Sequence, residues 1–275
     1  MNNEIIDILN HYIINNKDVD CLYVNDIVDV VIKTYNLEEY ITHVAFSNQN
    51  VSLSSPEASF CVDDKQLCFF LVPTYQEIKE IAKEFPIVNK TKHFNYLFVL
   101  NVLLHELEHA RQQLRINQDN NLESAILTAE YEQQFNLKKQ KNILNLFKAI
   151  KLQTLIRKHY WFSPSERMAE IDGCNISREI AMTMDDNISK NIFEYLEISN
   201  LLRGYCSSSI KSIMNAPTKF YLKKVNPKYD YSNIVLMSKK TNGDSTLMRL
   251  GLEVEIEEIK EVEDKRKILL RKINK

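Results

Sequence analysis

The chain has 275 residues, 44% of them hydrophobic, and a formal net charge of −2. This length suffices for one elaborated domain or two small ones, and the near-zero charge gives no electrostatic reason to expect nucleic acid as a partner. The five cysteines are odd in number and lack CxxC spacing, which favours reduced thiols in a cytoplasmic protein over a disulfide scaffold.

The N-terminal part of the chain predicts helices. Apolar residues recur at helical spacing over residues 3–15 and 24–36, and we expect Asn25 or Asp26 near the start of the second helix. We treat residues 1–40 as an N-terminal helical segment. The first residues lack the basic start and continuous apolar core of a signal peptide, and no apolar run reaches the length of a membrane span.

A small β-structure is predicted next. Residues 43–46 have the composition of a short strand, and residues 58–62 and 66–72 predict a β-hairpin around a polar turn. Cys61 and Cys68 can face each other across this turn, and we expect both to be reduced. With only four glycines in the chain, the remainder should be mostly helical.

A long helix predicted over about residues 91–116 carries an HExxH motif at residues 105–109. Residues four apart share one face of a helix, so His105 and His109 can offer imidazole nitrogens to a single metal ion. Glu106 lies about 100° round the helix from His105, beside the metal, where a general base is needed. Zinc suits such a site, because it takes nitrogen and oxygen ligands and lowers the pKa of bound water to about 7.

The alternative interpretation of the motif is a surface helix that happens to be rich in histidine and glutamate. Residues 96–104 argue against it, because they are apolar on all sides and therefore predict a helix that runs through the core.

A catalytic zinc ion needs a third protein ligand. The pattern HExxHxxGxxH is excluded, because Gln112 and Arg115 stand where its glycine and third histidine would be. A cysteine ligand from an upstream glycine-containing loop is also disfavoured, because Cys61 and Cys68 have no such neighbours. A glutamate from a second helix remains.

Ser163 and Pro164 predict the start of such a helix. Glu166, Glu170 and Gly173 then fall on one face of it. A glycine inside a helix costs about 0.8–1 kcal/mol relative to alanine, so Gly173 predicts close packing against the HExxH helix. We assign Glu166 as the third ligand and Glu170 as the acid that orients a ligating imidazole. Reversed roles for the two acids, and a capping box between Ser163 and Glu166, stay open.

The HELEH sequence followed by a helix with ExxAE resembles the gluzincin class of zinc metallopeptidases, and is most similar to the minigluzincins and the ImmA/IrrE-type metallopeptidases. The resemblance covers the two motif helices. It implies a predominantly helical, zincin-like α+β fold with a small sheet packed on the motif helix. It also implies Zn²⁺ held by His105, His109 and Glu166, and a water activated by Glu106. In related peptidases an edge strand of the sheet can hold an extended substrate, a role we expect for residues 66–72.

The long separation of the two motifs departs from compact members of the class and implies a helical insertion over residues 117–160. We therefore expect a zincin-like metallopeptidase domain over residues 41–206. Residues 207–275 form an accessory C-terminal region, which ends in a charged, solvent-exposed helix that starts near Glu253.

The predicted function is zinc-dependent hydrolysis of a peptide or protein substrate, with Glu106 as the general base. Enzymes of this class add a donor to the oxyanion, and the sequence offers five candidates: His159, Tyr205, Tyr221, Tyr229 and Tyr231. One alternative is a zinc-binding but catalytically inactive regulatory or interaction module on a peptidase scaffold. Others are a metal-free helical interaction protein and a different zinc hydrolase reaction, such as deacylation. The presence of Glu106 favours the enzyme, because a purely structural zinc site needs no base.

Overall fold

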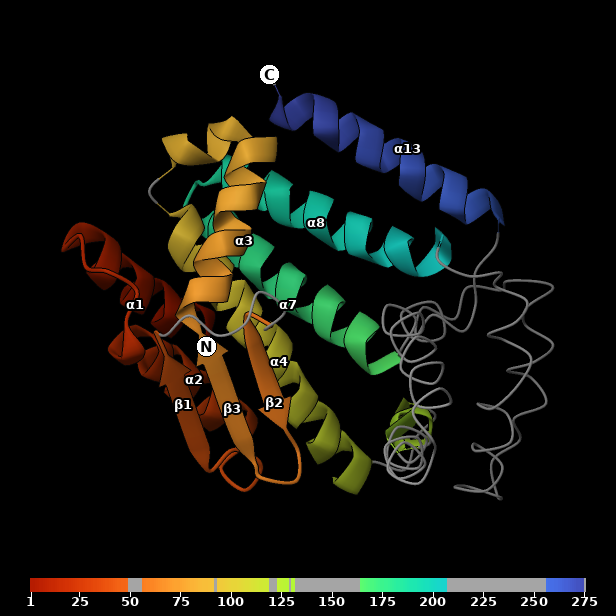
Figure 1. Cartoon of the computed structure of the whole chain (residues 1–275). Helices are drawn as coiled ribbons and strands as arrows, with labels where there is room; N and C mark the ends of the chain where they lie inside the picture. The colour runs from red at the N-terminus through yellow and green to blue at the C-terminus, as the bar shows by residue number, and fades with distance from the viewer. Residues whose placement is uncertain are drawn as a thin grey trace, which may run out of the picture. The chain divides into compact units, whose positions relative to one another are not determined.

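The computed structural model describes residues 1–48, 56–91, 93–118, 123–128, 130–131, 164–206 and 256–274. This part of the chain is predominantly helical with one small mixed sheet, so the expected α+β class is correct (Figure 1). The elements are α1 (Asn2–Ile14), α2 (Cys21–Tyr35), β1 (His43–Ser47), β2 (Ala58–Cys61), β3 (Gln66–Phe70), α3 (Leu71–Glu84), the 3-10 helix η1 (Pro86–Lys90), α4 (Phe94–Gln118), α7 (Pro164–Thr183), α8 (Asn187–Cys206) and α13 (Ile256–Ile273).

The chain divides into two compact units. The first contains residues 1–114, 169–197 and 267–275, and the second contains residues 115–168 and 198–266. Helices α1 and α2 thus belong to the same unit as the sheet. Most of the predicted insertion, and the accessory region before residue 256, lie outside the described residues.

One helix end differs from its prediction. Helix α2 begins earlier than expected, because Asp20 is its N-cap and accepts a hydrogen bond of 2.9 Å from the Tyr23 amide. Asn25 and Asp26 therefore lie inside the helix.

The sheet has the strand order β1-β3-β2. Strand β3 pairs in parallel with β1 and antiparallel with β2, so the predicted hairpin is present. Because β3 has a partner on both sides, the expectation that residues 66–72 offer a substrate-binding edge is wrong; residues 71–72 belong to α3. Strand β2 is an edge strand among the described residues. Cys61 and Cys68 are not opposite each other, since Cys61 pairs with Gln66, and both are free thiols.

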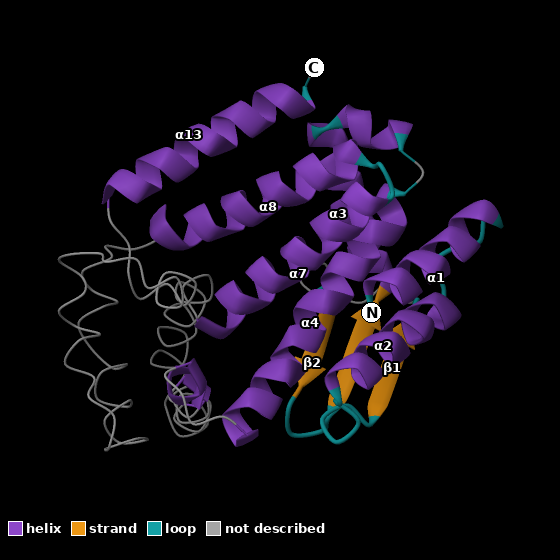
Figure 2. Ribbon diagram, turned by 180° about the vertical axis from the view of Figure 1, so that it is seen from behind, coloured by secondary structure: helices purple, strands orange, loops and turns teal. Residues whose placement is uncertain are grey.

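One face of the sheet carries most of its apolar side chains. The register places Leu67 and Phe69 of β3 level with Val44 and Phe46 of β1, and both β3 residues are completely buried. Helices α2 and α4 lie on one side of the sheet (Figures 1 and 2). The Tyr23 hydroxyl of α2 donates a hydrogen bond of 2.8 Å to the carbonyl of Tyr96 in α4, which ties the two helices together.

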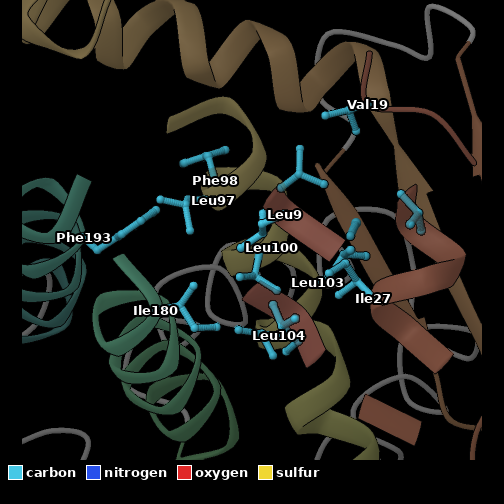
Figure 3. Close-up of a cluster of buried hydrophobic side chains, with 14 of the residues drawn as sticks. Leu9, Val19, Ile27, Leu97, Phe98, Leu100, Leu103, Leu104, Ile180 and Phe193 are labelled. Carbon is cyan, nitrogen blue, oxygen red and sulfur yellow. The ribbon is translucent and has the colours of Figure 1, made fainter. Parts of the chain in front are cut away.

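Helix α4 is the centre of the hydrophobic core (Figure 3). Its residues between 97 and 107 include several fully buried side chains, and they meet Leu9 of α1, Ile27 of α2 and Ile180 of α7 in one cluster. Burial of a leucine or phenylalanine side chain stabilises the fold by about 1.5–3 kcal/mol. The stretch at residues 96–104, apolar except for Asn101, therefore has the predicted role: it fixes α4, and the motif that follows, to the core.

Helix α7 approaches α4 very closely at Gly173. A Cβ atom at this glycine would lie 3.2 Å from the backbone nitrogen of His105 and 3.5 Å from the carbonyl oxygen of Asn101. One turn further on, the buried Ser177 donates a hydrogen bond of 3.2 Å to the Asn101 side chain. The predicted reason for a glycine inside this helix is confirmed: the backbone of α4 occupies the space that a side chain would need.

The variant Gly173→Val should lower the free energy of unfolding by about 1–3 kcal/mol, because the added side chain forces α7 away from α4. Denaturant unfolding monitored by circular dichroism measures this change. Met182→Val on the exposed part of the same helix is the control and should stay within about 0.5 kcal/mol of the wild type. Equal stability of the two variants would contradict the close approach.

Candidate metal centre

The two histidines of the HExxH motif lie on one face of α4, one turn apart. Their ring centroids are 5.2 Å apart and their planes are nearly perpendicular, at 81°. His105 keeps only 16% of its side chain exposed. The helix thus presents two partly buried imidazoles side by side, as the i,i+4 spacing predicts.

The carboxylate that completes the group is that of Glu166, in the first turn of α7. One ligand atom each from His105, His109 and Glu166 lie within 4.8 Å of one another. Ligands around a tetrahedral zinc ion stand about 3.4 Å apart when bond lengths are about 2.1 Å. The group is therefore of the right size for one ion after small side-chain rotations. Its two nitrogens and one oxygen form a donor set that zinc accepts, so the residues fit the metal.

Each histidine directs its Nδ1 atom at an acceptor. His105 Nδ1 lies 3.6 Å from Oε2 of Glu170, one turn after Glu166 on α7. His109 Nδ1 lies 3.1 Å from Oε1 of Gln112 on α4 itself. An imidazole whose Nδ1–H faces an acceptor keeps its Nε2 lone pair for a metal. The Nδ1 side of each ring is thus turned toward an oxygen acceptor.

Glu106 is held by the sheet. Its Oε2 atom accepts a hydrogen bond of 2.8 Å from the backbone N–H of Phe60 in β2. The Phe70 amide bonds to the Glu57 carbonyl across the β2–β3 pair. Since hydrogen-bonded pairs alternate along an antiparallel ladder, the Phe60 N–H points away from β3. An amide of the edge strand thus fixes the carboxylate next to the two histidines.

A partly buried ion pair supports the same turn of α4. Glu108, only 2% exposed, accepts a hydrogen bond of 2.6 Å from Arg111 Nη1. The guanidinium of Arg111 in turn stacks on the ring of Tyr35, 3.8 Å from its centroid. A buried carboxylate without such a partner would be strongly destabilising. The pair therefore allows the charged Glu108 to be buried within the HExxH motif. Through Arg111 and Tyr35 it also connects the motif to α2.

The first turn of α7 is held by Glu130. This carboxylate accepts hydrogen bonds of 2.9 Å from the Ser165 amide and 2.7 Å from the Ser165 hydroxyl. The first amides of a helix have no partner within the helix, and Glu130 provides one. Ser163 of the alternative capping box lies outside the described residues.

Two further ionisable groups next to the site have raised pKa values. Burial raises the pKa of Glu57, and the nearby carboxylates of Glu77 and Glu106 raise it further, although a backbone hydrogen bond and His105 act in the opposite direction. Burial also raises the pKa of the Cys174 thiol well above its usual value, with a second contribution from Glu170. The surroundings of the site are thus poorly solvated and favour neutral forms of these groups.

Comparisons with known protein families, with curated proteins and with solved structures found no match. None of the helices described is both long enough and apolar enough to cross a membrane. The five candidate oxyanion donors all fall outside the residues whose side chains are described.

Two groups in the site were not predicted from the sequence. Gln112 was considered only because it stands at the glycine position of HExxHxxGxxH, although its position three residues after His109 places it on the same side of the helix. The hydrogen bond from the Phe60 amide to Glu106 could not be predicted from the sequence, because the register of β2 and its distance from α4 depend on tertiary packing.

The purified protein should contain one zinc ion per chain, measured by elemental analysis after reconstitution. His105→Ala and Glu166→Ala should abolish binding, because each removes one of three ligands. Glu170→Ala should weaken it about 10–100-fold, as expected for a group that orients a ligand. If Glu170→Ala loses zinc while Glu166→Ala keeps it, the assigned roles of the two acids are reversed.

In metal-free protein, Glu57→Gln should raise the melting temperature more at pH 7 than at pH 4. The raised pKa of Glu57 means that folding favours its protonated form. Its contribution to stability is therefore present below the ordinary pKa and is lost as the pH rises through the folded-state pKa. Glutamine stays neutral and avoids this loss. Glu39→Gln, at an exposed position, is the control; equal shifts at both pH values would contradict the expectation.

Proposed function

We propose that this protein is a zinc-dependent metallopeptidase of the gluzincin type, with the small sheet and α4 in a zincin-like arrangement. The observation that supports the proposal is the group of His105, His109 and Glu166, whose ligand atoms lie within 4.8 Å of one another. The carboxylate of Glu106, the residue next to the first histidine, lies beside them. Zinc chemistry and a positioned base are the two requirements of metal-assisted peptide hydrolysis.

Bound zinc would polarise the substrate carbonyl and stabilise the negative charge that develops on its oxygen. The reaction also needs a group that moves a proton, and this is the proposed role of Glu106. One oxygen of its carboxylate is held by the Phe60 amide, which orients the other oxygen. Glu106 takes a proton from the attacking water and delivers it to the nitrogen of the leaving amine. The carboxylate thus returns to its starting state after each cycle.

The proposed place of the substrate backbone is strand β2. In its alternating ladder, the amide and carbonyl groups of Ala58 and Phe60 point away from β3. An extended peptide can pair with such groups. Because the Phe60 N–H already bonds Glu106, we expect the Ala58 groups and the Phe60 carbonyl to be the partners of the substrate.

We propose a cytoplasmic location on the basis of the cysteines. The four that the structure describes, Cys21, Cys61, Cys68 and Cys174, are all free. Free thiols persist in a reducing compartment, where structural disulfides are rare.

Glu106→Gln should abolish peptide hydrolysis, with a loss of at least about 10²–10⁴-fold in kcat, while zinc stays bound. Glutamine has nearly the same shape but cannot accept the proton from water. Cleavage of a peptide library, followed by mass spectrometry of the new N-termini, measures activity, and elemental analysis measures zinc.

The control is Glu179→Gln at an exposed position of α7, which should be as active as the wild type. Full activity of Glu106→Gln would exclude the proposed mechanism. Zinc binding without hydrolysis of any library member by the wild type would favour the inactive zinc-binding module.

A further inference from the structure

Gln112 is a buried polar residue in direct contact with one of the metal-binding histidines. Its side chain is completely inaccessible to solvent, and its Oε1 atom lies 3.1 Å from His109 Nδ1. Side chains of an α-helix lean back over the preceding turn, so a residue three positions after a histidine can reach its ring. Buried amide groups are nearly always hydrogen-bonded, and here the bond is made to the imidazole.

The direction of this bond determines which tautomer of His109 is present. An amide oxygen can only accept, so the ring nitrogen that faces it must carry the hydrogen. A neutral imidazole has a single N–H. With the hydrogen on Nδ1, the Nε2 atom keeps its lone pair. The contact with Gln112 therefore selects the form of His109 that can bind a metal ion through Nε2.

The two histidines have chemically different partners. His105 faces the carboxylate of Glu170 at 3.6 Å, whereas His109 faces a neutral amide. With zinc bound, Glu166 would bring one negative charge as a ligand, and Glu170 would bring a second through His105. A neutral partner for His109 orients the ring without a further negative charge, and so preserves the positive character on which carbonyl polarisation depends.

We propose that Gln112 is the positioning residue for His109: it fixes the Nδ1–H tautomer and the ring orientation needed for zinc. This inference rests on the proposed zinc function but assigns a role to a residue that the HExxH and ExxAE motifs do not include. It concerns the metal-free chain as well, because the tautomer is set before any ion binds.

The first test is the tautomer of His109 in the metal-free wild type, read from long-range ¹⁵N–¹H correlation spectra above the histidine pKa. We expect the hydrogen on Nδ1. In Gln112→Leu, which keeps the approximate volume but removes the acceptor, both tautomers should become populated. A wild-type His109 that carries its hydrogen on Nε2 would overturn the inference.

The second test is zinc affinity, measured by competition with a chromogenic chelator and using Zn²⁺ alone as the probe. Gln112→Leu should bind about 10–100-fold more weakly than the wild type, as is typical when a group that orients a metal ligand is lost. Gln112→Glu restores the acceptor and should recover most of the affinity. This rescue separates a positioning role from a general loss of packing, and it keeps the test valid if Gln112→Leu folds poorly.

Gln113→Leu is the matched control. It makes the same chemical change at the next position of α4, where the side-chain nitrogen is buried and has no hydrogen-bond partner among the described residues. Its zinc affinity should equal that of the wild type. Unchanged affinity in Gln112→Leu, with zinc bound normally by the wild type, overturns the inference alone. Absence of zinc from the reconstituted wild type overturns the proposed function as well.

Discussion

The candidate metal centre depends on the close approach of two helix backbones. Helices α4 and α7 carry the two motifs, and they pack closely at Gly173, where even a Cβ atom would lie only 3.2 Å from the backbone nitrogen of His105. A larger residue would separate the helices and move the acids of α7 away from the histidines. A helix-destabilising residue is therefore retained where geometry outweighs its cost of about 1 kcal/mol.

Around this contact, different kinds of interaction hold the groups of the site. Hydrophobic burial fixes α4 from residue 97 onward. An amide of β2 holds Glu106, a partly buried arginine neutralises Glu108, and a glutamine and a glutamate face the two imidazoles. Few of these groups are left to solvent, so the relative positions of the histidines and Glu106 are set by the fold. Such preorganisation favours catalysis, because little rearrangement is needed when a substrate binds.

The sequence was sufficient for what depends on local pattern. The i,i+4 spacing placed His105 and His109 on one face, the apolar run at 96–104 predicted a core helix, and Gly173 indicated a close helix contact. It was insufficient where distant segments meet. The parallel pairing of β1 with β3 made a predicted edge strand into a central one, because strand order depends on long-range packing that alternation does not encode. The Phe60 amide was missed for the same reason.

The contact between Phe60 and Glu106 also affects how the sheet behaves toward other chains. An edge strand with an open row of amides and carbonyls is a template for pairing with a second molecule, and proteins protect such edges with charged groups. At Phe60 the outward N–H is already bonded to a carboxylate. Glu106, which we propose moves protons, thus also protects the edge of β2. This limits unwanted association at the strand where we expect a substrate to bind.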